Sequence, residues 1–192
     1  DLVHATLDVL VDAGAELVPI TIPASLEATN ALTSLIISTE AASIHQPWLQ
    51  TRPEDYGNQT RARMNSGLTT AATRYIQARS LRTPLLADFA KTVFDQVDVL
   101  HCPVMNTAVP TIIETDLSAN PGFAEFIGQM GHCTRPINYL GLPSLTVPCG
   151  FTENGLPSAF QIVARPFDEA TMLRVGHAYQ AATDWHTRMP PL

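Results

Sequence analysis

The most informative pattern of hydrophobic and polar positions runs from residue 134 to residue 169. Two nearly continuous apolar runs, at 144–148 and 159–164, each predict a strand that is covered on both faces. Gly141 and Gly155 stand at the corner and the loop between these elements, where backbone conformations occur that a side chain would strain. Asp168 then predicts the N-cap of a final helix that ends near Trp185.

The upstream sequence predicts more helices than strands. A helical period over residues 1–13 stops at Gly14, and Val18, Ile20 and Ile22 then alternate as a strand, which gives half of an α/β unit. The strand that would precede this helix is expected upstream of residue 1. Pro47 is expected to end the helix that follows. The remaining predictions are helices over 25–45, 61–82, 84–96 and 122–129 and a strand over 97–102. The fold class is therefore α/β, organised as one domain over residues 1–192.

The composition excludes several kinds of partner. The 192 residues contain 18 acidic and 11 basic side chains, for a net charge of −7, which argues against binding a nucleic-acid backbone. No apolar run approaches the roughly 18 residues of a membrane span, so no membrane partner is expected. The three cysteines show no C-x-x-C spacing, which fits reduced thiols and a cytoplasmic location.

Two His-Cys pairs invite a catalytic or metal-binding interpretation. His101 and Cys102 are adjacent on a predicted strand, so their side chains point to opposite faces and do not reach one ion. No spacing typical of a zinc site surrounds either this pair or His132-Cys133. We expect ordinary packing at both pairs, and neither a metal nor an organic cofactor. Lys91, the only lysine, is expected to be a solvated helix residue.

The region from residue 134 onward resembles the C-terminal part of the amidase signature family. The pattern is T-x-P-x-N-x-x-G-L-P-x-x-x-V-P-x-G-F, then G-L-P, then a strand ending in R-P-F before an acidic helix start. It comprises Thr134, Pro136, Asn138, Gly141, Leu142, Pro143, Val147, Pro148, Gly150, Phe151, Gly155, Leu156, Pro157, Arg165, Pro166, Phe167 and Glu169. The resemblance implies a mixed β-sheet flanked by helices on both faces.

The resemblance also implies hydrolysis or transfer of the acyl group of a carboxamide. Family members use a serine nucleophile, a second serine in a cis peptide bond, and a lysine, all toward the N-terminal side of the domain. This chain has no adjacent serines and no Gly-Gly pair. No catalytic residue is therefore expected within it, and the isolated chain is expected to be inactive.

The candidate substrate-binding residues lie on two loops. By resemblance, the stretch before Thr134 contributes to the acyl pocket, which nominates Gly131, His132 and Cys133. Gly131 stands where glutamine-using members carry an aspartate for the substrate ammonium group, which favours a neutral amide. Met105 and Asn106 follow a strand end, where sites form in α/β sheets. The alternative is that all five are ordinary loop residues.

Three polar residues near the signature have competing interpretations. Asn138 either holds the backbone around Gly141, which we favour, or contacts substrate. Arg135 and Arg165 either bind a substrate carboxylate bidentately or, as favoured, pair with a nearby acidic side chain.

The expected partners are a small-molecule amide and the missing N-terminal half of the same protein, with a homodimer left open. Two alternatives to a hydrolase remain. One is a non-catalytic scaffold or subunit that completes a partner chain, and the other is an amidotransferase subunit.

Overall fold

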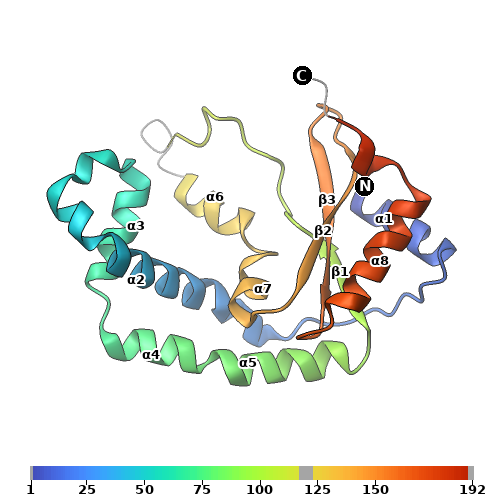
Figure 1. Cartoon of the computed structure of the whole chain (residues 1–192), viewed down its shortest axis with the longest axis horizontal. Helices are drawn as coiled ribbons and strands as arrows, with labels where there is room; N and C mark the ends of the chain where they lie inside the picture. Colours follow the sequence, from blue (N-terminus) through green and yellow to red (C-terminus); the bar gives the residue numbers. More distant parts are fainter. Residues whose placement is uncertain (1, 117–122, 190–192) are drawn as a thin grey trace. The chain divides into compact units, whose positions relative to one another are not determined.

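The structure, a computed structural model, describes residues 2–116 and 123–189 (Figure 1). The chain divides into two compact units, and each is presented by itself. The first comprises Asp1–Pro23, Ala87–Asn106 and Gly141–Leu192, and the second Ala24–Leu86 and Thr107–Leu140. The single-domain organisation expected from the sequence stays a prediction.

The first unit contains a three-stranded sheet in the order β1-β3-β2. Its strands are β1 (Val99–Pro103), β2 (Ser144–Phe151) and β3 (Pro157–Ala164). Both pairings are antiparallel, with a bulge in β2 between Pro148 and Gly150. The central strand β3 is fully buried from Phe160 onward, as its continuous apolar run predicts. The α/β class and all three of these strands are confirmed.

Helices α1 (Leu2–Asp12) and α8 (Glu169–Ala182) pack against one face of this sheet. That face presents every second residue of each strand, because side chains alternate across a sheet. The buried core between them consists of Leu10, Val147, Cys149, Phe160, Ile162, Ala164, Met172 and Tyr179. Helix α1 ends where predicted, and Gly14 has a positive φ of 96°.

Helix α8 begins as predicted, because the Asp168 carboxylate accepts the backbone N–H of Thr171 at 3.4 Å. The buried side of the helix includes Met172 and Tyr179. Gly176 belongs to it, and Ala182 is exposed. A Cβ added at Gly176 would lie 2.4 Å from Leu145 Cδ2, so the missing side chain lets the helix approach the sheet closely.

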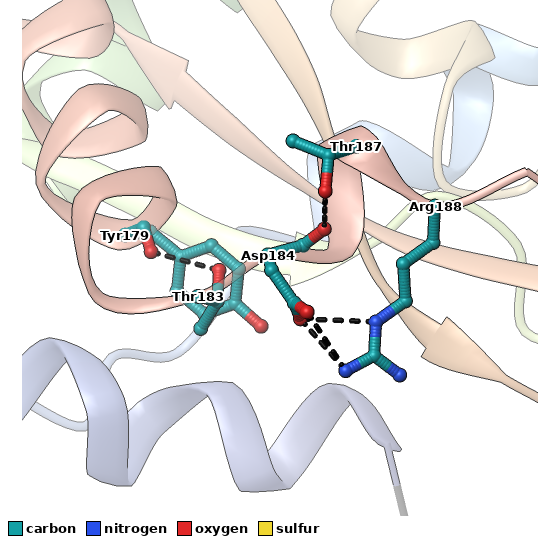
Figure 2. Close-up of polar contacts among 5 residues, drawn as sticks. All are labelled: Tyr179, Thr183, Asp184, Thr187 and Arg188. Atoms are coloured by element: carbon teal, nitrogen blue, oxygen red, sulfur yellow. Dashed lines mark hydrogen bonds and ion pairs between the residues drawn. The ribbon is translucent and has the colours of Figure 1, made fainter.

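The end of α8 is held by short-range polar contacts (Figure 2). Thr183 Oγ1 donates to the Tyr179 carbonyl at 2.9 Å, and Arg188 forms a bidentate pair with Asp184 at 3.0 Å for both bonds. The single turn η4 (Trp185–Thr187) follows, and the Arg188 guanidinium lies 4.2 Å from the centre of the Trp185 ring. The chain therefore leaves α8 in a defined conformation.

The strand predicted over residues 18–22 is wrong. The segment is neither helix nor strand, and Leu17, Val18 and Ile22 are each more than 40% exposed. A strand needs backbone hydrogen bonds to a neighbouring strand. The sheet of the described residues contains only β1, β3 and β2 and does not include this segment. The residues alternate as in a strand, but no described segment pairs with them through backbone hydrogen bonds.

The second unit is helical and is built around α2 (Ala28–Thr51), which packs chiefly against three other helices. These are α3 (Asn58–Leu68), α4 (Ala72–Ser80) and α7 (Arg135–Leu140). The Tyr139 hydroxyl of α7 donates to the Ala78 carbonyl of α4 at 2.5 Å, in a buried position. The unit also contains the single turns η1 (Ala24–Glu27) and η2 (Pro53–Asp55), and α6 (Phe123–Met130).

Three helix boundaries differ from the sequence expectation. Pro47 does not end α2, which continues to Thr51 with Leu49 buried in its last turn. The helix predicted over 61–82 is two helices, and the hydroxyls of Thr69 and Thr70 at the break bond to the Ser66 carbonyl, in competition with the helical backbone. The helix predicted over 84–96 is α5 (Arg82–Phe89), at the boundary of the two units, followed by the π-helical turn η3 (Ala90–Phe94).

Candidate functional site

The first candidate loop, with Met105 and Asn106, leaves the end of β1 in the first unit. Met105 is half-buried and Asn106 is exposed. The loop is anchored by Gln161 at the centre of the sheet, which is 2% exposed. Its amide nitrogen donates to the Pro103 carbonyl at 3.0 Å, and its amide oxygen accepts from Ser144 Oγ at 3.0 Å.

Gln161 thus ties the three strands together at a point two residues before Met105. We did not predict this role from the sequence, although a lone amide inside an apolar run was a visible signal. A buried amide needs hydrogen-bond partners, and the neighbouring strands supply them here.

The second candidate set, Gly131, His132 and Cys133, forms the turn between α6 and α7 in the second unit. The Gly131 carbonyl accepts the backbone N–H groups of Thr134 at 3.2 Å and Arg135 at 2.9 Å. His132 is exposed, whereas Cys133 is half-buried. Burial raises the pKa of the Cys133 thiol, so this cysteine is a poor nucleophile.

The Arg135 side chain folds back over this turn. Its Nη2 donates to the Ile127 carbonyl at 3.3 Å. A Cβ placed on Gly131 would lie 2.6 Å from Arg135 Nε, so the absence of a side chain at 131 makes room for the guanidinium. The Thr33 hydroxyl of α2 lies 3.5 Å from the Arg135 carbonyl and marks where the start of α7 meets α2.

The predicted pairing of both arginines with acidic side chains is wrong for the residues that the structure describes. Arg135 bonds to a carbonyl of α6, and Arg165 donates to the carbonyl of Phe94, in η3. Asn138 is exposed, and the described residues show no hydrogen bond from its side chain to the Gly141 corner. Gly141 itself reaches a φ of 73°, which glycine adopts without help.

His101 is half-buried and lies against the core of the first unit. Its ring stacks on Phe160 with ring centres 4.8 Å apart, and its Nε2 lies 2.8 Å from Thr6 Oγ1. The Thr6 hydroxyl donates its one proton to the Val3 carbonyl at 2.6 Å. It can therefore only accept from His101, so the Nε2–H of His101 is the donor of that bond. Burial lowers the pKa of His101 below its usual value, and the nearby His4 adds to this shift.

Lys91 is exposed on η3, as predicted. Within residues 2–116 and 123–189, no group of three or more His, Cys, Asp or Glu side chains is placed to hold a metal ion. Over the same residues, none of the helices combines the length and the apolar character needed to cross a bilayer. Met105 and Asn106 belong to one unit and Gly131, His132 and Cys133 to the other, so their roles as one substrate site stay a prediction.

The family model described as Amidase matches residues 1–173. The chain belongs to the amidase family. A glutamyl-tRNA(Gln) amidotransferase subunit of Chloroflexus aggregans (strain MD-66 / DSM 9485) is 42% identical over 148 residues, which cover 74% of this chain and 29% of that protein. An amidase of Pseudomonas putida is 34% identical over 191 residues, which cover 99% of this chain and 40% of that protein.

Solved structures agree with this assignment. A crystal structure of an amidase superposes with a TM-score of 0.78 at 27% identity, over 94% of this chain and 41% of that one. The resemblance to amidase signature enzymes is therefore confirmed. The chain spans well under half of the length of these relatives, so the activity of the whole protein is a matter for proposal.

Proposed function

We propose that this chain is part of an amidase that hydrolyses the C–N bond of a non-peptide carboxamide. The serine nucleophile, the relay serine and the lysine base reside on polypeptide outside these 192 residues. The observation that carries the proposal is the family match over residues 1–173. These 192 residues contain no adjacent serines and a single lysine, so they hold no serine–lysine set suited to the chemistry. Residues Met105, Asn106, Gly131, His132 and Cys133 would form part of the acyl pocket.

The surroundings of Lys91 support an external base. A lysine acts as a base only when burial or a neighbouring cation favours its neutral form. Lys91 is exposed on the helical turn η3, so it lacks the burial that such a base needs. The relatives are longer than this chain, which leaves room for the missing groups.

The turn before α7 favours a substrate without an ammonium group near the amide. Gly131 offers no carboxylate to hold a cation, and the guanidinium of Arg135 lies over it. A positive substrate group would be repelled there, because like charges a few ångströms apart disfavour each other. The charge at this turn thus favours a hydrolase of simple amides over an enzyme that takes free glutamine.

An amidotransferase component is the second candidate, and one observation favours it. The relative at 42% identity is named as part of a glutamyl-tRNA(Gln) amidotransferase. A non-catalytic subunit that completes a partner chain is the third candidate. All three need further polypeptide, and they differ in the substrate that the completed pocket accepts.

A domain replacement tests the proposal. The 192 residues would replace the 40% of the Pseudomonas putida amidase that they match. The chimera is expected to hydrolyse aliphatic or aromatic amides and to leave glutamine intact, while the isolated chain hydrolyses neither. A folded chimera that acts on glutamine alone would favour the amidotransferase. Turnover by the isolated chain above the rate in water would contradict an external nucleophile.

A further inference from the structure

Arg135 is a half-buried cation for which the structure describes no acidic partner. Arg52, Arg79 and Arg188 each form an ion pair with a nearby carboxylate, whereas the described residues offer Arg135 none. Within the described part of the chain, Arg135 makes one side-chain hydrogen bond, from Nη2 to the Ile127 carbonyl. A guanidinium has five N–H donors in a fixed fork, so most of its donors are left for solvent or a ligand.

The backbone of Arg135 is held on both sides, and its side chain packs on the turn. The backbone N–H of Arg135 donates to the Gly131 carbonyl at 2.9 Å, and the Thr33 hydroxyl lies beside its carbonyl. Its side chain lies against the bare backbone of Gly131, where a Cβ would come within 3.1 Å of both Arg135 Cγ and Cδ. A flexible surface arginine has no such constraint, and a preorganised fork loses less entropy when it binds an anion.

A second unpartnered polar side chain follows on the same helix. Asn138 lies one turn after Arg135 on α7, and residues three apart on a helix are neighbours on its surface. Asn138 is exposed, and no side-chain hydrogen bond of Asn138 occurs in the described part of the chain. Arginine suits a carboxylate and an amide side chain suits a carboxamide, so the two together match a molecule that contains both groups.

We propose that Arg135 determines substrate specificity by binding a carboxylate, and that the substrates are short-chain carboxamides which also carry a carboxylate. This inference rests on the proposed function, which assigns the turn at 131–133 to the acyl pocket. Arg135 binds and orients the substrate and takes no part in proton transfer.

Three amides of similar size separate the charge requirement from general amide hydrolysis. They are succinamate, which is anionic, butyramide, which is neutral, and β-alaninamide, which is cationic. We would measure kcat/KM for each with the chimera described above, in its unmodified form and as Arg135→Gln, Arg135→Lys and Arg63→Gln. Arg63 is an exposed arginine of α3 in the same unit, so Arg63→Gln controls for the loss of one positive charge.

We expect succinamate to be preferred over butyramide, and Arg135→Gln to lower kcat/KM for succinamate by about 10- to 100-fold, as for the loss of a hydrogen bond to a charged group. The change should appear mainly in KM. Butyramide should change less than about threefold by the same comparison, and Arg63→Gln should behave like the unmodified chimera. Arg135→Lys should recover part of the loss, because it keeps the charge but not the fork.

The two proposals fail in different ways. A chimera that hydrolyses butyramide as well as succinamate, with no effect of Arg135→Gln on their ratio, overturns the role of Arg135 and leaves the amidase proposal standing. A folded chimera that hydrolyses none of the three amides contradicts the proposed function. In that event, equilibrium dialysis of the 192-residue chain against labelled succinamate decides on Arg135. Binding that Arg135→Gln weakens supports its role, and binding that it leaves unchanged, or no binding, overturns it.

Discussion

Replacing Gly67 with alanine should separate two helices of the second unit. Gly67 lies in the last turn of α3, where it packs against Ser38 and Ala42 of α2. A Cβ at this position would lie 2.0 Å from the Ser38 carbonyl oxygen, 2.4 Å from its carbonyl carbon and 2.9 Å from Ala42 Cβ. Two of these three atoms belong to the backbone of α2, so no side-chain rotation relieves the clash.

The magnitude follows from two opposing effects. Ordinary contact begins at 3.4 Å, so the distance to the Ser38 oxygen must grow by about 1.4 Å. Forcing extra volume into a packed interior costs about 1–3 kcal/mol. Alanine in place of glycine gains up to about 1 kcal/mol in a helix. Because the clash involves backbone, we expect a net loss of about 2 kcal/mol in the free energy of unfolding.

The chain supplies both the assay and the control. It contains two tryptophans, Trp48 in the second unit and Trp185 in the first, so Trp185→Phe leaves a fluorophore that reports on the second unit alone. Urea titration in this background would compare Gly67→Ala with Gly128→Ala. A Cβ on Gly128 in α6 has nothing within 4 Å, so that substitution should be neutral or slightly stabilising. The close packing of α2 on α3 would be refuted if both variants shifted the urea midpoint upward.

Three further outcomes are expected. His101 has a lowered pKa in the folded state, so its neutral form contributes stability above about pH 6.5. This stability is lost as the pH falls below that value. Trp185 emission during urea unfolding at several pH values should show the dependence, and His101→Gln should flatten it. Tyr139→Phe removes the donor to the buried Ala78 carbonyl and should cost about 1–3 kcal/mol, visible in Trp48 emission; an unchanged midpoint would exclude that bond. Cys149 is 3% exposed and its pKa is raised by burial, so it should react with a thiol reagent more slowly than the other two cysteines, as peptide mapping of the labelled chain would show.

The sequence predicted best those elements whose signals are local. The cap at Asp168 and the positive φ of Gly141 and Gly155 depend on residues within a few positions, and the structure confirms each. The apolar run of β3 predicted a central strand, because a strand that is buried on both faces has apolar residues at successive positions and not only at every second one. Gln161 was missed because its partners come from two other strands, and only their pairing brings them together.

Of the candidate site, the sequence predicted where the loops are but not what they contact. Met105 and Asn106 do follow a strand end, and Gly131, His132 and Cys133 do form a turn. The interpretation of Arg135 was wrong because an arginine usually pairs with an acid, and here a carbonyl and a bare glycine backbone surround the guanidinium instead. Composition does not encode that geometry. It depends on how the turn between α6 and α7 places Arg135 next to the Ile127 carbonyl.

Two segments of the chain carry apolar side chains that remain exposed. Residues 18–22 alternate like a strand yet have no ladder, and α2 presents Ile37, Ile44 and Trp48, spaced seven and four residues apart on one side, at 43–66% exposure. A helix with apolar residues on both sides is usually covered on both sides. Both segments thus have apolar surface that the contacts within their own unit do not bury. The relatives contain more than twice as much polypeptide as this chain. Apolar surface of this kind is what a chain needs in order to pack against further protein, and it agrees with the proposal that the serine nucleophile lies on such a segment.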